Sequence, residues 1–505
     1  MKATCIVDSD FIVGPVRSRT FGSFVEHLGR CVYTGLYEPD HPTATPEGFR
    51  SDVLDLVKQL GVTTIRYPGG NFVSGYQWTD GVGPVDQRPR RLDLAWHSTE
   101  PNKVGVDEFM AWARQAGVEP MMAVNLGTAG VDQALALLEY CNAPAGSYWA
   151  DQRVANASVE PHRVKMWCLG NEMDGPWQMG HKTATEYGRA AAETARAMRM
   201  IDPGVELVVC GSSGVGMPTF GSWEHEVLSQ TYDQVDMVSA HAYYFEEEGD
   251  RDSFLASAID MDYFIDSVVA TADAVKAATK QSKTIGISFD EWNVWYQHRA
   301  ESRPPSGDDW PVAPVLLEDH YTVADAVVVG NLLMSLLRHT DRVYSASLAQ
   351  LVNVIAPIMT ETGGRAWTQT TFHPFALTAR HAVGEVLKTA IDCPSHDTAK
   401  FGDTPLVDAV ATRDPATGQM SVFLVNRSCE EAADVEIKLR GFDSAAIIEA
   451  ITLSHVDSGW IASADDPSDQ VLSVNTTPVV AQGRVCIKVP AVSWTLLRLA
   501  TVAED

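Results

Sequence analysis

The sequence lacks paired cysteines, long apolar runs and a leader pattern. Its 8 Cys among 505 residues are scattered and include no CxxC pair, which argues against a disulfide framework and against a zinc site. No run of about 18 apolar residues occurs, so we expect no membrane span. Residues 1–5 lack the charged and then apolar plan of a signal peptide, and we therefore expect a cytoplasmic protein.

Positive charge is also scarce. Only 38 Lys and Arg stand against 66 Asp and Glu, and the formal net charge is −28. A nucleic-acid partner requires a basic face, so this class of function is disfavoured. The acidity argues more weakly against an anionic substrate, and a solvated, soluble surface is its simplest interpretation.

Two apolar stretches that end in polar clusters organise the rest of the chain. Residues 164–172 begin apolar and end in Asn171-Glu172, and residues 283–293 have the same form and contain Glu291. Barrel enzymes place their chemistry on carboxylates at the C-terminal ends of buried parallel strands. The two stretches are separated by about three strand–helix units of ~30–40 residues each. They would therefore be strands four and seven of an eight-fold barrel.

Alternating strand and helix patterns surround these two stretches. We expect strands at 21–27, 63–68, 118–126, 164–172, 206–212, 237–244, 283–293 and 343–352. We expect helices at 46–60, 107–116, 131–140, 183–200, 223–232, 254–279, 323–339 and 374–387. The pattern predicts an α/β fold whose first domain, residues 16–390, is a (β/α)8 TIM barrel. The long connections after the strand ends would build a site.

The pattern of apolar and turn residues changes after about residue 390. Short β-rich runs follow one another, separated by turn residues such as those at 414–418. This pattern is typical of an antiparallel β-sandwich, here jelly-roll-like. A short strand at 3–8 precedes the barrel, and we expect residues 1–15 and 391–505 to form this second domain together.

Two carboxylates on separate strand ends suit the cleavage of a glycosidic bond. One protonates the leaving oxygen, while the other attacks the anomeric carbon or activates water. These roles require different environments, one that raises a pKa and one that keeps a carboxylate ionised. Spacing does not tell which of Glu172 and Glu291 takes which role. Taken alone, either glutamate is more often a helix cap or an ion-pair partner.

Polar residues at the other strand ends favour the catalytic interpretation. An amide beside a catalytic carboxylate can donate to a sugar hydroxyl, an arginine can keep a carboxylate ionised, and tryptophan faces suit the C–H faces of sugars. Each candidate alone is as easily a packing or ion-pair residue. The candidates are Glu26, Arg66, Asn71, Asn171, His241, Tyr243 and Gln350, with Trp96 and Trp295 in the loops. For Trp177 and Trp292 the sequence does not decide between sugar binding and packing.

The motifs together resemble the α-L-arabinofuranosidases of glycoside hydrolase family 51. The resemblance covers essentially the whole chain. It rests on the stretches at 66–72 (RYPGGNF), 169–177 (LGNEMDGPW), 241–243 (HAY) and 290–295 (DEWNVW), and those at 90–96 (RRLDLAW) and 349–353 (AQLVN) fit the same family.

This resemblance implies a retaining exo-acting enzyme in which Glu172 is the general acid/base and Glu291 the nucleophile. It also implies arabinoxylan fragments, arabinan and arabino-oligosaccharides as substrates, no metal or other cofactor, a cytoplasmic location and a homo-oligomer, often a hexamer. The sugar-binding residues it implies are Glu26, Asn71, Asn171, Tyr243 and Gln350, with Trp96 and Trp295 bordering the pocket.

Two other functions remain open from the residues alone. A β-xylosidase or an endoglucanase on a similar barrel would carry the same Asn-Glu pair. A carbohydrate-binding protein without activity is disfavoured, because both glutamates are present.

Overall fold

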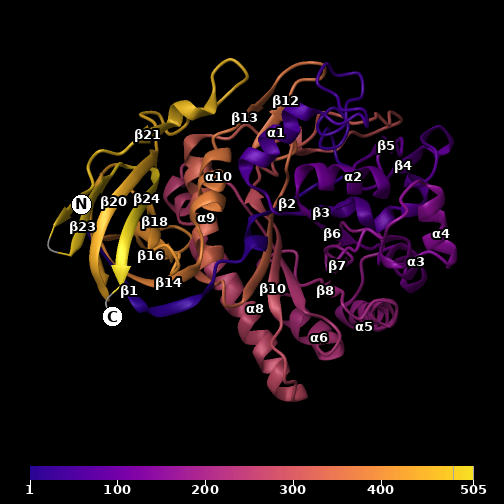
Figure 1. The fold of residues 1–505 in the computed structure, drawn as a ribbon, viewed down its shortest axis with the longest axis horizontal. Coiled ribbons are helices and arrows are strands. Elements are labelled where there is room, and N and C mark those ends of the chain that lie inside the picture. The colour runs from indigo at the N-terminus through magenta and orange to yellow at the C-terminus, as the bar shows by residue number, and fades with distance from the viewer. Residues whose placement is uncertain (482, 504–505) are drawn as a thin grey trace.

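A closed barrel of eight parallel strands forms the larger part of the molecule (Figure 1). The computed structural model describes residues 1–481 and 483–503. The barrel strands are β2 (Gly22–Phe24), β3 (Thr64–Tyr67), β6 (Glu119–Ala123), β7 (Met166–Leu169), β8 (Glu206–Val209), β9 (Met237–Tyr244), β10 (Gly286–Val294) and β11 (Val343–Leu348). All eight lie where the sequence predicts them, and β7 and β10 are the fourth and seventh.

Helices cover the outside of the barrel, as expected. They are α1 (Ser51–Leu60), α2 (Val106–Ala116), α3 (Val131–Asn142), α5 (Ala184–Ile201), α6 (Ser222–Thr231), α7 (Arg251–Leu255), α8 (Ala258–Thr279), α9 (Val323–Arg338) and α10 (Phe372–His381). In α1 the buried residues recur at helical spacing, and Gly61 ends the helix in a left-handed conformation with φ 81°. In the described residues no helix is long and apolar enough to cross a membrane.

Two helix predictions were wrong in detail, and one helix was not predicted. The first helix begins at Ser51 rather than at residue 46, and α4 (Tyr148–Ala155) was not expected. The last predicted helix, 374–387, ends at His381. Gly384 turns the chain there with φ 76°, and residues from Glu385 onward form a strand. A helical pattern of apolar residues cannot distinguish the end of a helix from a buried strand that follows it closely.

The C-terminal domain is a ten-stranded, mostly antiparallel sheet, which confirms the predicted second domain type. Its order is β21-β20-β24-β18-β17-β14-β1-β19-β23-β22. The strands are β1 (Lys2–Pro15), β14 (Glu385–Asp392), β17 (Val407–Arg413), β18 (Gln419–Asn426), β19 (Ala433–Arg440), β20 (Phe442–Leu453), β21 (Leu472–Val474), β22 (Val479–Ala481), β23 (Arg484–Val489) and β24 (Ser493–Ala503). The N-terminal strand lies inside this sheet, antiparallel to β14 and parallel to β19.

The large sheet encloses its own hydrophobic core. Residues of β20 and β24, near one end of the sheet, share this core with residues of β19 and β23, near the other end. The sheet therefore curls back on itself, which gives it the layered form expected of a sandwich. Helix α9, almost entirely buried, packs between this sheet and the barrel (Figure 1).

Three small two-stranded sheets complete the described strands. They are β4 (Arg91–Asp93) with β5 (Ser98–Glu100), β12 (Ile358–Thr360) with β13 (Ala366–Thr368), and β15 (Ser395–Thr398) with β16 (Gly402–Pro405). The first two lie in the long connections after β3 and β11, where the sequence pattern predicts the walls of a site.

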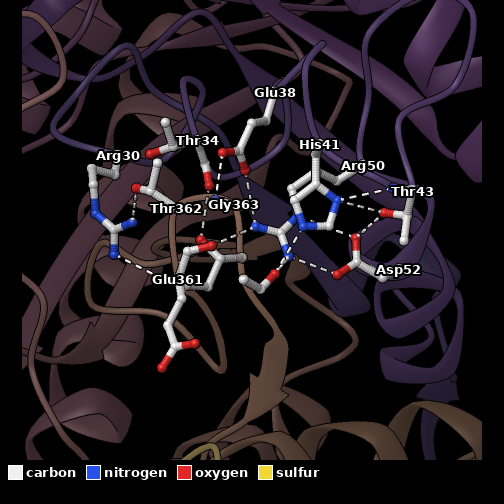
Figure 2. Close-up of polar contacts among 12 residues, drawn as sticks. Arg30, Thr34, Glu38, His41, Thr43, Arg50, Asp52, Glu361, Thr362 and Gly363 are labelled. Carbon is white, nitrogen blue, oxygen red and sulfur yellow. Dashed lines mark hydrogen bonds and ion pairs between the residues drawn. The ribbon is translucent and has the colours of Figure 1, made fainter.

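The tip of the β12–β13 hairpin is fastened to the loop after β2, as Figure 2 shows. The buried Arg50 donates to both carboxylate oxygens of Asp52, at 3.1 and 2.7 Å, and to Glu38 at 3.1 Å. It also donates to the carbonyl oxygens of Glu361 at 2.9 Å and Gly364 at 2.7 Å. A buried guanidinium with this many partners fixes both loops in one arrangement.

The contact between α9 and the C-terminal sheet requires a residue without a side chain. A Cβ at Gly330 would lie 2.8 Å from Nε1 of the buried Trp494 on β24, and closer still to its Cδ1. We expect Gly330→Ala to lower the free energy of unfolding by about 1–3 kcal/mol, because the ring has no room to move. The measurement is the midpoint of guanidinium unfolding.

The matched control is Gly188→Ala in α5. There the added Cβ would first meet, at 2.9 Å, the amide end of the Gln230 side chain. That flexible group can move aside, and alanine is about 1 kcal/mol better than glycine in a helix interior. Equal midpoints for the two variants would contradict the predicted role of Gly330.

Candidate active site

The two predicted catalytic glutamates face each other at one end of the barrel. Glu172 follows β7, where Gly170 (φ 96°) and Glu172 itself (φ 43°) turn the backbone, and Glu291 lies on β10. Both side chains are buried. A carboxylate oxygen of each and a ring nitrogen of His241 all lie within 4.8 Å of one another. The barrel therefore brings together two carboxylates that are far apart in sequence.

Glu291 is held as a hydrogen-bond acceptor at both of its oxygens. Arg66 Nη1 donates to Oε1 at 2.6 Å, and the Tyr243 hydroxyl donates to Oε2 at 2.7 Å. The same guanidinium donates through Nη2 to Asn171 Oδ1 at 2.6 Å. Donors on both oxygens fix the orientation of the carboxylate, as a carboxylate nucleophile requires.

Glu172 is also held by two donors. His241 Nδ1 donates to Oε1 at 2.9 Å, and Trp177 Nε1 donates to Oε2 at 2.7 Å. Burial alone would raise the pKa of Glu172, but the hydrogen bond and the charge of His241 outweigh it and hold that pKa below its usual range. This direction is the opposite of the raised pKa expected for one of the two carboxylates.

His241 carries a positive charge between these carboxylates. Burial works against that charge, but the charge of Glu291 and the hydrogen bonds to Asp290 and Glu172 raise the pKa of His241 to about 10. Its Nε2 donates to Asp290 Oδ1 at 2.9 Å. At neutral pH both ring nitrogens therefore carry a proton.

Glu26 is a further buried carboxylate in the site. The Phe72 backbone N–H and Trp96 Nε1 donate to Oε1, each at 2.9 Å, and Gln350 Nε2 donates to Oε2 at 3.1 Å. Burial raises the pKa of Glu26 to about 8, although these donors oppose the rise. A Cβ at Gly70 would lie 3.1 Å from a Glu291 oxygen and 3.3 Å from a Glu26 oxygen. The glycine thus keeps the space between the two carboxylates open.

The other predicted residues lie around this centre. Asn71 accepts from Gln178 Nε2. Trp295 packs edge-on against the Tyr243 ring, with centroids 5.0 Å apart. Trp177, which the sequence left open, contacts Glu172, whereas Trp292 is fully buried in the core and does not reach the site.

Asp290 is a buried contact of the site that the sequence pattern does not predict. Strand alternation would send it to the face opposite Glu291. The pairing of β10 with both neighbours shifts register here, between Ser288 and Glu291 on one side and between Phe289 and Trp292 on the other. This irregularity brings both adjacent carboxylates within 4.0 Å of His241. Two acidic residues in succession at a strand end are the signal that could have suggested it.

One group in the described part of the chain has the composition of a metal site. It consists of Glu172, His241 and Glu291. Metal ligation requires a neutral imidazole, whereas His241 is protonated and hydrogen-bonded at both nitrogens. The group is better described as a hydrogen-bonded acid–base cluster.

Known protein families match this chain along most of its length. The α-L-arabinofuranosidase 1 domain matches residues 56–258, and the α-L-arabinofuranosidase C-terminal domain matches residues 290–493. An exo-α-(1→6)-L-arabinofuranosidase from Bifidobacterium longum is 56% identical, covering 99% of this chain and 97% of its own. The chain belongs to the α-L-arabinofuranosidase family.

Two further comparisons agree with this assignment, and the second of them names glycoside hydrolase family 51. An intracellular exo-α-(1→5)-L-arabinofuranosidase from Streptomyces lividans is 55% identical over 98% of this chain and 75% of its own. The solved structure of a family 51 α-L-arabinofuranosidase from Bifidobacterium longum has a TM-score of 0.94 and 49% identity, covering 98% of this chain and 99% of its own. The resemblance seen in the motifs is confirmed.

The raised pKa of Glu26 predicts a contribution of this residue to the stability of the arabinofuranosidase that is lost as the pH rises. An unfolded glutamate ionises near pH ~4.3, whereas the folded one keeps its proton until about pH 8. Between these values the folded state binds the extra proton, so the free energy of unfolding falls with rising pH, by up to about 1.4 kcal/mol per pH unit. Glu26→Gln removes this contribution.

The test is guanidinium unfolding of wild type and Glu26→Gln at pH 5, 6.5 and 8. We expect the difference in unfolding free energy to move in favour of the variant as the pH rises. Parallel pH curves for the two proteins would show that Glu26 is ionised in the folded state.

Proposed function

We propose that the chain is a retaining, exo-acting α-L-arabinofuranosidase that releases terminal, non-reducing α-L-arabinofuranosyl residues by double displacement. The observation that carries this proposal is the approach of Glu172 and Glu291, which have carboxylate oxygens within 4.8 Å of each other. Retaining glycosidases hold the two carboxyl groups about 5–5.5 Å apart, whereas inverting ones need about 6.5–9.5 Å to admit a water.

In the first step Glu291 attacks the anomeric carbon while Glu172 protonates the leaving oxygen. Arg66 and Tyr243 hold Glu291 in place and balance its charge before the attack. A covalent glycosyl–enzyme forms, and water then releases the arabinose with Glu172 acting as base.

Unpartnered polar atoms in the site support sugar binding. Asn171 Nδ2 and Gln350 Oε1 are buried and have no hydrogen-bond partner among the described residues. A buried polar atom without a partner is costly, and a bound sugar hydroxyl would satisfy each of them. Further contacts to the arabinofuranose are assigned to Glu26, Asn71 and Tyr243, with Trp96 and Trp295 as walls.

The substrates, location and assembly are inferred from the resemblance to the family. We infer that the enzyme acts on arabinoxylan fragments, arabinan and arabino-oligosaccharides in the cytoplasm, as a homo-oligomer, with a hexamer as the specific expectation. The Streptomyces relative is named intracellular, which supports the location. The names of two relatives at similar identity specify (1→5) and (1→6) linkages, so overall identity does not select one linkage.

Single substitutions of the two glutamates test the assigned roles. Glu291→Ala removes the nucleophile, so we expect retaining turnover of an aryl arabinofuranoside to be abolished and not restored by azide. Glu172→Ala keeps the nucleophile, so azide should rescue it on substrates with good leaving groups, giving an arabinosyl azide of retained configuration. The measurements are the hydrolysis rates of the two variants with and without azide, and the anomeric configuration of the azide product by NMR. Near-wild-type rates in both variants would exclude the assignment.

A substrate panel separates the alternatives. We expect kcat/KM for α-L-arabinofuranosides to exceed that for β-xylopyranosides and β-glucans by about 10²-fold or more, because hydrogen bonds to ring hydroxyls discriminate strongly. Preference for a pyranoside would indicate a β-xylosidase or an endoglucanase. Binding without hydrolysis would indicate a carbohydrate-binding protein. Arabinobiosides of each linkage in the same panel identify the preferred bond.

A further inference from the structure

His241 lies between carboxylates from two strand ends. Its Nδ1 is 2.9 Å from Glu172 Oε1 and 3.6 Å from Glu291 Oε2, and its Nε2 is 2.9 Å from Asp290 Oδ1. A neutral imidazole has one N–H and can donate to only one carboxylate. Hydrogen bonds from both ring nitrogens to ionised carboxylates therefore require the imidazolium.

This arrangement raises a question about the general acid. On the proposed function, Glu172 must carry a proton when the glycosidic bond breaks. Its surroundings nevertheless hold its pKa below the usual range, because Trp177 donates to Oε2 and the imidazole of His241 lies 2.9 Å from Oε1. The nearest proton on a group that can release one is the one on His241 Nδ1.

We propose that His241 stores the proton that Glu172 delivers to the leaving group, and that Asp290 is a positioning residue that fixes which ring proton can move. In the step, the Nδ1–H bond breaks, its electron pair stays on Nδ1, and an O–H bond forms at Glu172. Neutral His241 keeps the Nε2 proton and its bond to Asp290. Glu172 then protonates the glycosidic oxygen as the carbon–oxygen bond breaks.

The second half of the reaction returns a proton to His241. Glu172 takes a proton from the water that attacks the glycosyl–enzyme, and the proton passes back to His241 Nδ1. Protons balance over the cycle, and no other reactant is needed. The proposal rests on the roles assigned above to Glu172 and Glu291.

The geometry explains why the Nε2 proton stays in place. Asp290 is fully buried, with Arg66 Nε 3.8 Å from Oδ2 and the Cys168 thiol donating to the same oxygen at 3.7 Å. Burial would raise the pKa of Asp290, but the charges of Arg66 and His241 hold it below its usual range. Asp290 thus remains an acceptor and does not compete for the moving proton.

Several charged or titratable groups lie around His241 and its carboxylate partners, and Glu172, Asp290 and Glu291 raise its pKa. Asp174 differs from the others because its hydrogen bonds go to the Ser213 backbone and hydroxyl, which makes it a suitable control. The groups are Glu172 and Asp174 after β7, Cys168 on β7, Asp290 and Glu291 on β10, Arg66 on β3, Cys210 after β8 and Tyr243 on β9.

The test is Asp290→Asn, assayed in the full-length protein on two substrates. We expect kcat/KM to fall about 10²–10³-fold on an arabino-oligosaccharide, whose leaving group needs the acid, and less than about 10-fold on a dinitrophenyl arabinofuranoside, which does not. We also expect the alkaline limb of kcat/KM on the oligosaccharide to move down by about one pH unit. The stored proton is lost more readily once the neighbouring negative charge is removed.

Asp174→Asn serves as the matched control. It removes a carboxylate that lies close to the same centre but accepts its hydrogen bonds from Ser213. We expect it to keep the wild-type ratio between the two substrates. Equal losses on both substrates for Asp290→Asn, with an unmoved alkaline limb, would reduce Asp290 to a structural role and overturn the proposal.

A second variant keeps the proposal testable if Asp290→Asn does not fold. His241→Gln retains a hydrogen-bonding amide but cannot store a proton, and it should show the same split between substrates. Rescue by azide distinguishes a failure of the role assigned to Glu172 from a failure of the proton store at His241. If azide fails to rescue Glu172→Ala, the assigned role of Glu172 is wrong. If azide rescues that variant while His241→Gln and Asp290→Asn show no split, only the proton store is wrong.

Discussion

The guanidinium of Arg66 is the interaction on which the site depends. Four acidic side chains, Glu26, Glu172, Asp290 and Glu291, are buried at one end of a barrel that belongs to a strongly acidic protein. Buried charges persist only when they are paired and hydrogen-bonded. Arg66 bonds to Glu291, lies near Asp290, and stacks over the Phe24 ring at 4.8 Å. Together with protonated His241 it keeps the cluster partly ionised.

The barrel supplies the geometry for this balance. Parallel strands deliver their carboxyl ends to one side, so β3, β7, β9 and β10 place a guanidinium, two carboxylates and an imidazole within contact. The loops above the strands are held from outside. Arg50 clamps the hairpin that follows β11 to the loop that follows β2 (Figure 2). The catalytic groups therefore lie on rigid strands, and clamped loops surround them.

Sequence periodicity was sufficient for the barrel and insufficient at irregular points. All eight strands were predicted because buried parallel strands give short apolar runs. The end of α10 was missed, since Gly384 breaks a pattern whose hydrophobic content continues into β14. Asp290 was missed because a register shift in β10 overrides the alternation of strand faces. Trp177 stayed open because nothing in a loop sequence fixes the direction of a side chain.

The sequence alone determined the kinds of groups, their order along eight strands, and the family to which the chain belongs. It could not determine which carboxylate holds a proton. That depends on distances between residues of different strands and on their burial, and neither is encoded by neighbours along the chain. Only the tertiary structure placed His241 between Glu172 and Asp290 and lowered the pKa of Glu172. Electrostatic energies act through space, so the protonation of the site became visible only in the folded molecule.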